Sequence, residues 1–352
     1  MNTNVKERQM QAVVKINPGY DQMSYQSLEI PQATGNLVKI KVAYTGICGS
    51  DIHTFKGEYA NPKTPVTLGH EFSGTVVEVG ENVTSIKVGD RVTSETTYTT
   101  CEECIYCEEK DYNLCSNRRG IGTQVDGSMS EYVLSREESV HILTDNITLE
   151  AAALSEPLAC VVHAVLEKTN TTKDDTVLIF GPGPIGILLA QVVKAQGARV
   201  IMAGITKDME RLELAKELGV DLIVDTLQED LTEFVMEVTD GYGADKVFDC
   251  SGAVVAVNQG LALTKKKGDF VQVGLFADKF TAIDTESIIQ REINYIGCRS
   301  QKPSSWAIAL DLLDKGKINT DKMITKVYDL KDWREAFETV MGGSEMKVLV
   351  QS

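Results

Sequence analysis

Apolar and polar positions alternate in two different ways along the chain, and the change falls near residue 155. Before it, short alternating runs lie between glycine and polar turns and predict strands over 37–44, 73–79 and 130–134. An alternation of period two places the apolar side chains on one face of a sheet. Residues 1 to about 155 are therefore predicted to form a mainly antiparallel β domain.

Between Thr176 and Val273, apolar runs alternate with stretches of helical spacing, an order that predicts βαβ units and a doubly wound parallel sheet. The expected elements are strands over 177–180, 200–203, 222–224, 247–249 and 270–273, with helices from Ile185 and over 209–218. The fold class is therefore α/β. After the sheet, helices over 304–313 and 333–340 and a strand over 347–350 are expected to pack against the first domain.

Composition adds limits on partners and compartment. The 352 residues, 43% of them apolar, suit two domains. The 51 acidic and 35 basic residues give a net charge of −16, which opposes nonspecific binding to nucleic acid or anionic membranes. The polar first ten residues predict no signal peptide and hence a cytoplasmic protein. The apolar run 176–193 is interrupted by glycines and prolines, so we interpret it as strand, turn and helix rather than a membrane span.

Half of the eight cysteines crowd one loop with the spacing C-x2-C-x2-C-x7-C: Cys101, Cys104, Cys107 and Cys115. Such spacing predicts a closed tetrathiolate zinc site, which is structural because it leaves no position for substrate. Disulfides or unrelated thiols are the alternatives, and the crowding of the cysteines argues against them.

Gly181, Gly183 and Gly186 form G-x-G-x-x-G between an apolar strand and a helix. The glycines permit a tight turn, close approach of a pyrophosphate and close packing of helix on strand, so this turn predicts dinucleotide binding. A glycine turn that merely links strand to helix is the alternative. We also expect the cofactor to contact Pro184, Ile185, Val273 and Gly274.

The end of the second strand bears on the choice between NAD and NADP. An acidic residue would bond the ribose hydroxyls of NAD there, but the position is Gly204. Nearby Thr206, Lys207 and Arg211 could bind a 2′-phosphate, which makes NADP, or both cofactors, plausible. Asp208 could instead turn back toward the ribose.

A second set of possible metal ligands lies outside the cysteine loop. Cys48, His70 and Glu71 offer a thiolate, an imidazole and a carboxylate, and Glu156 is a further candidate. Three or four such ligands suit an open, catalytic zinc site. Each residue taken alone would more often be an ordinary buried side chain.

Five motifs together resemble one family, the zinc-dependent medium-chain dehydrogenases. They are Gly46 to His53, Gly69 to Gly80, Val88 to Val92, the four-cysteine loop and Gly181 to Gly186. The resemblance implies a GroES-like catalytic domain over 1–158 and 298–352, with a zinc lobe at about 95–120, and a Rossmann domain over 159–297. It also implies an active site in the cleft between them, one catalytic and one structural zinc per chain, and a homodimer or homotetramer.

Glu71 and Glu156 resemble the polyol branch, which contains sorbitol and threonine dehydrogenases. Within it, 19–23, 54–59 and 274–276 are similar to bacterial dehydrogenases of arabitol phosphate. A polyol or polyol phosphate is thus the expected partner, and an unphosphorylated polyol is the alternative. The candidate phosphate-binding cations are Lys56, Arg118, Arg119 and Arg299.

The resemblance also implies a mechanism in which the alcohol binds zinc at Cys48, His70 and either Glu156 or Glu71 and passes hydride to the nicotinamide. Ser50 would take the alcohol's proton and His53 would carry it toward solvent. Carboxylate ligands would also allow manganese or cobalt to replace the zinc.

Three other classes of protein are alternatives to this family. A zinc-free quinone reductase or a non-catalytic NAD(P)-binding redox sensor would lack the Cys48, His70 and Glu71 set, and a zinc ribbon for nucleic acid conflicts with the acidic charge. His163 is expected to be a packed histidine, and Cys160, Cys250 and Cys298 are expected to be buried small hydrophobes.

Overall fold

The computed structural model describes residues 9–58 and 63–352. Their contacts divide the chain into two compact units. The first holds the described residues up to Glu156 together with 302–314 and 320–352, and the second holds 157–301 and 315–319. Most of the polar first ten residues, for which no signal peptide was predicted, lie outside the described residues. So does Tyr59, which belongs to the segment similar to the arabitol-phosphate dehydrogenases.

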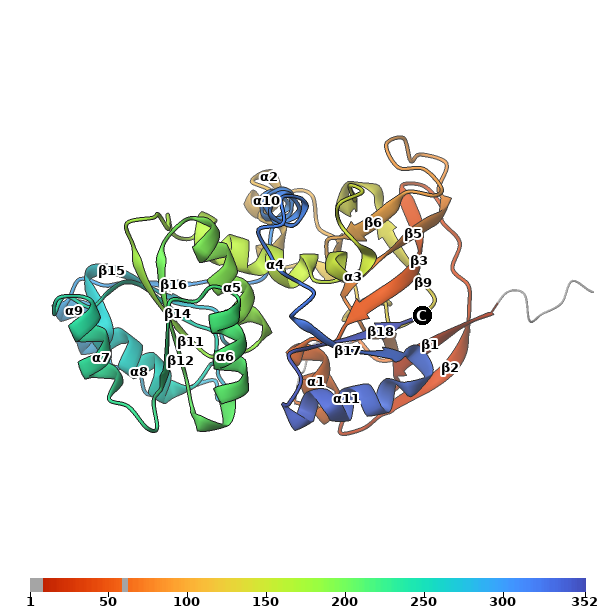
Figure 1. The fold of residues 1–352 in the computed structure, drawn as a ribbon. Coiled ribbons are helices and arrows are strands. Elements are labelled where there is room, and N and C mark those ends of the chain that lie inside the picture. Colours follow the sequence, from red (N-terminus) through yellow and green to blue (C-terminus); the bar gives the residue numbers. More distant parts are fainter. Residues whose placement is uncertain (1–8, 59–62) are drawn as a thin grey trace, which may run out of the picture. The chain divides into compact units, whose positions relative to one another are not determined.

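The first unit is built mainly from β-strands (Figure 1). Its strands are β1 (Gln9–Lys15), β2 (Met23–Glu29), β3 (Leu37–Gly46), β4 (Val66–Thr67), β5 (Glu71–Val79), β6 (Arg91–Ser94), β7 (Thr97–Thr99), β8 (Arg119–Gly120), β9 (Tyr132–Arg136), β10 (Val140–Ile142), β17 (Ile324–Asp329) and β18 (Lys347–Gln351). They form a three-stranded sheet of order β2-β1-β4, a β7-β8 pair, and a sheet of order β10-β6-β5-β3-β18-β17 in which β9 also pairs with β3.

Alternating burial explains why these strands form. In β3, Val38, Ile40 and Val42 are buried and pack with Phe72 and Val76 of β5. The pairs within this unit are antiparallel except β17 with β18, as the sequence predicts for a mainly antiparallel domain.

Five short helices accompany these sheets: α1 (Gly49–Lys56), α2 (Ile105–Glu108), α3 (Leu149–Ala152), α10 (Pro303–Asp314) and α11 (Trp333–Gly342). The expected packing of the tail on the first domain is confirmed for α11 and β18, whose Phe337 and Val348 share a core cluster with Val13 of β1. Residues 315–319 belong instead to the second unit.

The second unit is a parallel sheet of order β13-β12-β11-β14-β15-β16 with helices on both faces (Figure 1). The strands are β11 (Thr176–Phe180), β12 (Arg199–Gly204), β13 (Leu222–Asp225), β14 (Ala244–Asp249), β15 (Thr264–Gln272) and β16 (Asn294–Gly297). The helices are α5 (Pro184–Ala195), α6 (Met209–Glu217), α7 (Leu231–Val238), α8 (Val254–Leu263) and α9 (Thr285–Gln290). The predicted doubly wound sheet is confirmed.

Helix α4 (Ser155–Val162) passes from the first unit into the second and continues as a π-helical turn over His163–Glu167. Among the described residues, no helix combines the length and apolar character needed to cross a bilayer. The run 176–193 forms β11, a turn and most of α5, as expected.

Two strand predictions need correction. The strand expected over 130–134 is Tyr132–Arg136, since Ser130 forms only an isolated bridge with Ala12 of β1 and its hydroxyl bonds the carbonyl oxygens of Gly127 and Tyr132. The strand expected from Phe270 already begins at Thr264, where three exposed lysines hide its periodicity.

Candidate metal and dinucleotide sites

Cys48, His70 and Glu71 meet where β3 and β5 pair. Gly46, the last residue of β3, is the register partner of Glu71, the first residue of β5. Cys48 follows as the N-cap of α1. Each of the three side chains offers one ligand atom, and these atoms all lie within 4.8 Å of one another. A thiolate, an imidazole nitrogen and a carboxylate oxygen at this spacing fit a zinc ion.

Asp51 supports this cluster, a role that the sequence reasoning missed. Its Oδ2 accepts a hydrogen bond of 2.9 Å from the Cys48 N–H, and its Oδ1 lies 3.7 Å from His70 Nδ1. The Nδ1 atom is buried without a hydrogen-bond partner among the described residues. A carboxylate behind a metal-binding histidine orients the ring, so Asp51 is placed to hold His70 toward a metal. Its position three residues after Cys48, in the first turn of α1, is the sequence feature from which its bond to the Cys48 N–H could have been predicted.

Lys347 reaches the same cluster from β18. Its Nζ donates to Glu71 Oε2 and to the Ile47 carbonyl oxygen at 3.1 Å, and the Lys347 and Glu71 side chains are only 3% and 2% exposed. A Cβ on Gly46 would overlap both side chains, so a larger residue there would displace the ion pair. Burial alone would lower the pKa of Lys347, but Glu71 and Cys48 raise it above its usual value.

The electrostatics of the cluster favour a bound cation. Burial disfavours the charged form of His70, yet Asp51, Cys48 and Glu156 hold the pKa of this histidine well above its usual value. Glu156 is buried at the start of α4, although it is not one of the three residues whose ligand atoms lie within 4.8 Å. Three carboxylates, those of Asp51, Glu71 and Glu156, thus act on one histidine and one lysine, which makes the cluster attractive to a cation.

Ser50 and His53 lie in α1, two and five residues after Cys48. Ser50 is half-buried, whereas the His53 side chain is 59% exposed. His53 Nδ1 lies 2.8 Å from Glu58 Oε2, and Gly57 turns the chain through a left-handed conformation (φ 77°) that brings Glu58 back beside His53. A half-buried hydroxyl followed by an exposed imidazole is an arrangement able to carry a proton outward.

The four-cysteine loop closes as predicted. Cys101 Sγ lies 3.9 Å from Cys107 Sγ and 3.6 Å from Cys115 Sγ, and Cys104 Sγ lies 3.5 Å from Cys107 Sγ. Sulfurs bound tetrahedrally to one zinc ion at about 2.3 Å would be about 3.8 Å apart. All four are free thiols, so the disulfide alternative is wrong. The donor set and spacing fit a structural zinc.

The glycine turn lines a cavity of about 420 Å³ in the second unit. Gly181 adopts φ 92° after β11, and Gly183 is the N-cap of α5 with no atom near the place of a Cβ. A Cβ on Gly186 would overlap the Gly181 carbonyl oxygen. The three glycines therefore have the three geometries that dinucleotide binding requires, and the exposed N–H groups of α5 can receive a pyrophosphate.

Sequence comparison identifies the family. Residues 34–145 match the alcohol dehydrogenase GroES-like domain, and residues 184–315 match the zinc-binding dehydrogenase domain. The chain is 64% identical to the D-arabitol-phosphate dehydrogenase of Enterococcus avium over 97% of each chain, and 50% identical to a sorbitol dehydrogenase of Halalkalibacterium halodurans over 97% of this chain and 99% of the relative. The chain belongs to the zinc-dependent medium-chain dehydrogenases.

Solved structures agree with this assignment. A zinc-binding dehydrogenase from Sinorhizobium meliloti 1021 bound to NADP matches with a TM-score of 0.91 and 32% identity over 98% of this chain and 99% of that one. The expected GroES-like and Rossmann folds are thus confirmed, and the protein is a zinc-dependent NAD(P) dehydrogenase. The readings as a zinc-free quinone reductase, a redox sensor or a zinc ribbon lose their support.

In this dehydrogenase, Lys207, Asp208 and Arg211 line the dinucleotide cavity beside Gly204. Asp208 Oδ2 accepts a hydrogen bond of 3.2 Å from the Ile205 N–H, so its carboxylate is turned back toward the end of β12. Thr206 instead donates its hydroxyl to Asp225 Oδ2 at 2.7 Å. Pro184, Ile185, Thr206, Val273 and Gly274 are not among the residues that line this cavity.

The four cations that the sequence suggested for a substrate phosphate have different surroundings. Arg118 donates to the hydroxyls of Thr96 and Thr97, and Lys56 is exposed at the end of α1. Arg119 lines a cavity of the first unit, while Arg299 belongs to the second. Lys63, which the sequence reasoning missed, lines the same cavity as Arg119.

The remaining histidine and cysteine predictions have mixed outcomes. His163 is buried and packed as expected, with Nδ1 2.5 Å from Glu167 Oε2. Cys160, Cys250 and Cys298, which were expected to be buried small hydrophobes, are only partly buried. Cys250 lines the dinucleotide cavity, so part of its surface is exposed there.

Proposed function

We propose that this dehydrogenase interconverts a pentitol phosphate, with D-arabitol phosphate as the first candidate, and the corresponding ketose phosphate. The observation that carries the proposal is the 64% identity to the Enterococcus avium D-arabitol-phosphate dehydrogenase over nearly the whole chain. An unphosphorylated polyol is the second candidate, because a sorbitol dehydrogenase is 50% identical.

We propose that residues 1–158 and 298–352 form the catalytic domain and that residues 159–297 form the domain that binds the cofactor. Cys48 and His70, with Glu71 or Glu156, would hold the catalytic zinc, which lowers the pKa of a bound alcohol. Asp51 orients His70, and Lys347 orients Glu71. A second zinc at the four-cysteine loop would be structural. The homo-oligomeric state and the cytoplasmic location remain predictions from the sequence.

Initial rates with D-arabitol phosphate, D-arabitol and sorbitol, each with NAD and with NADP, test the proposal on zinc-loaded enzyme. Hydrogen bonds from cations to a phosphate contribute about 1.5–3 kcal/mol each, so two of them predict kcat/KM about 100-fold or more in favour of the phosphorylated pentitol. Equal or better turnover of the free polyols would reject the phosphorylated substrate and leave the dehydrogenase assignment intact.

Replacing Ser50 with alanine is expected to lower kcat while the dissociation constant of the cofactor stays within about twofold. The hydroxyl is proposed to accept the substrate proton, and a positioned proton-transfer group contributes about 10²–10⁴-fold. Stopped-flow rates of cofactor reduction, compared with cofactor titrations, separate the two quantities. Unchanged kcat would show that Ser50 only shapes the turn before α1.

Replacing both Lys207 and Arg211 with alanine is expected to raise KM for NADP at least 10-fold and to leave KM for NAD nearly unchanged. Only NADP carries the 2′-phosphate that these cations of the dinucleotide cavity could pair with. Lys216→Ala is the matched control, since Lys216 is exposed and lies in α6, the helix that carries Arg211. Equal effects on the two cofactors would contradict a 2′-phosphate role.

A further inference from the structure

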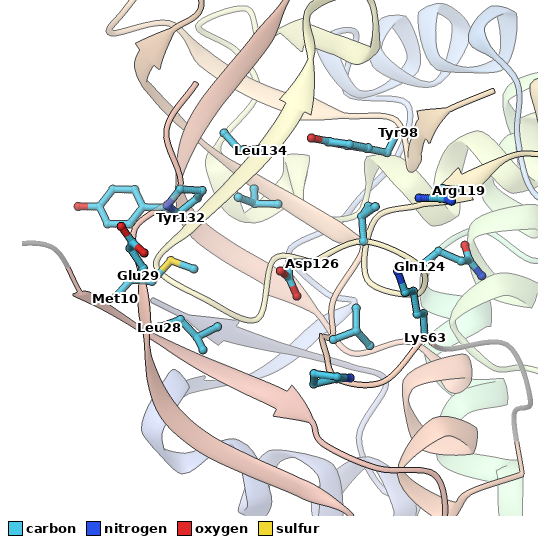
Figure 2. A pocket seen from close by; sticks show the side chains of 15 residues that line it. Met10, Leu28, Glu29, Lys63, Tyr98, Arg119, Gln124, Asp126, Tyr132 and Leu134 are labelled. Atoms are coloured by element: carbon cyan, nitrogen blue, oxygen red, sulfur yellow. The ribbon is translucent and has the colours of Figure 1, made fainter. Parts of the chain in front are cut away.

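The first unit contains a second cavity, of about 520 Å³, which neither the metal ligands nor the glycine turn lines (Figure 2). Its walls come from Met10 of β1, Leu28 of β2, 132–134 of β9 and the segment 119–126. Cys48, His70, Glu71 and Glu156 are not among its lining residues. The volume is within the range of small-molecule sites, about 300–1,000 Å³.

Two cations occupy one end of this cavity. The Lys63 N–H donates to the Thr123 carbonyl oxygen at 2.9 Å, and Gln124 Oε1 accepts a hydrogen bond of 2.8 Å from the N–H of Gly120, the residue after Arg119. These bonds bring Lys63 and Arg119 to the same end, with Gln124 between them (Figure 2). Within residues 9–58 and 63–352, neither the ammonium nor the guanidinium group has a hydrogen-bond or ion-pair partner.

The Lys63 and Arg119 side chains are both exposed, so their charges are accessible to a ligand that enters from solvent. A phosphate monoester carries close to two negative charges, and it accepts bidentate hydrogen bonds from a guanidinium and a further bond from an ammonium. The charge and donor geometry at this end therefore suit a phosphate group.

Farther into the cavity, the polar groups change from donors to acceptors. Asp126 projects from the middle of the wall in Figure 2 and accepts the Thr67 N–H through Oδ1 at 2.8 Å, which leaves Oδ2 for another donor. Val66 and Val133 add buried apolar surface. A carboxylate suits a hydroxyl donor and repels a second anion, so the ligand should be anionic at one end only and hydroxylated beyond it.

We propose that this cavity binds a phosphate ester of a polyhydroxylated carbon chain, with the phosphate between Lys63 and Arg119 and a hydroxyl donating to Asp126. The proposal rests on the proposed function where the ester is the substrate, and it goes beyond that function where the ester is a second molecule. The ester is either the enzyme's own substrate, anchored by its phosphate, or a second molecule that regulates the enzyme.

The backbone links this cavity to the metal cluster. A Cβ on Gly122 or on Gly127 would overlap the carbonyl oxygen of Gly69, the residue before His70. The segment that carries Arg119 and Gln124 therefore packs directly against the backbone that presents His70. A ligand held by this segment is well placed to influence the metal site.

Isothermal titration of the zinc-loaded protein with D-arabitol phosphate, inorganic phosphate and D-arabitol tests the proposal without turnover. The double variant Lys63→Gln/Arg119→Gln is expected to bind the ester about 100-fold more weakly and to bind D-arabitol unchanged, because two charge-assisted hydrogen bonds are lost. The matched control Lys87→Gln/Lys173→Gln removes two charges at exposed positions elsewhere and should retain the parental affinity. Zinc content and thermal unfolding verify the fold of each variant.

Rates distinguish the two sources of the ester. For an anchored substrate, KM for the phosphorylated polyol rises in parallel with the loss of affinity, and the KM of free polyols does not. For a regulatory molecule, the number of esters bound per chain falls by one while the KM values stay the same. Parental affinity and stoichiometry in the double variant would overturn the proposal. An enzyme that oxidises only free polyols would contradict the proposed function yet leave this binding test valid.

Discussion

Replacing Lys347 with methionine is expected to destabilise the metal-free protein by about 3–5 kcal/mol. The Lys347 ammonium and the Glu71 carboxylate are both almost fully buried and bonded to each other, so removing the lysine leaves an unpaired charge inside the protein. Urea unfolding of the parent and the variant in the presence of a chelator measures the difference. Lys326→Met, an exposed lysine on the neighbouring strand β17, should have little effect.

The metal provides a second, more specific outcome for the same variant. A zinc ion bound by Cys48, His70 and Glu71 would replace the missing positive charge, so saturating zinc should reduce the destabilisation. The double variant Lys347→Met/Glu71→Gln should recover much of the lost stability, because it buries no net charge. A loss of stability that neither zinc nor Glu71→Gln reduces would mean that Lys347 acts through packing alone.

Local patterns were sufficient to predict the chemistry of this chain. The four cysteines lie within fifteen residues, and the glycine turn directly follows β11, so their spacing alone constrains the geometry. The sequence also predicts that Cys48 and His70 belong to one cluster, and the structure brings them together, because each lies beside glycines at the end or start of a strand. Chain segments of this length leave few alternative arrangements.

Contacts between distant segments were not predictable. Lys347 lies 276 positions from Glu71, and the two meet only because β18 pairs with β3 in one register. A shift of one residue would turn the lysine to the other face of the sheet. The pairing of β1 with β2 was missed for a related reason, since β2 is mostly polar and half-exposed. Asp51 and Lys63 gain their roles from segments that only the fold brings near them.

Replacing Cys48 with serine is expected to remove one zinc per chain and to lower kcat about 1,000-fold or more. The cluster would lose its thiolate, the ligand that zinc binds most strongly here. A catalytic metal lowers the activation barrier by several kcal/mol, and each 1.4 kcal/mol is about a tenfold change in rate. Metal analysis by mass spectrometry and initial rates measure the two effects. Thermal stability measured in a chelator should change little, because the metal-free proteins differ only by oxygen in place of sulfur at the N-cap of α1.

Cys107→Ser is the informative counterpart, since Cys107 is buried among the four clustered sulfurs and lies outside the Cys48 cluster. It should also remove one zinc, but the main result should be a lower melting temperature, because a metal bound by the four sulfurs would organise the loop between β7 and β8. Cys298→Ser, which alters a partly buried thiol of neither cluster, should retain both ions. If Cys48→Ser kept two zinc ions, or if Cys107→Ser abolished turnover without loss of stability, the assignment of one catalytic and one structural site would be wrong.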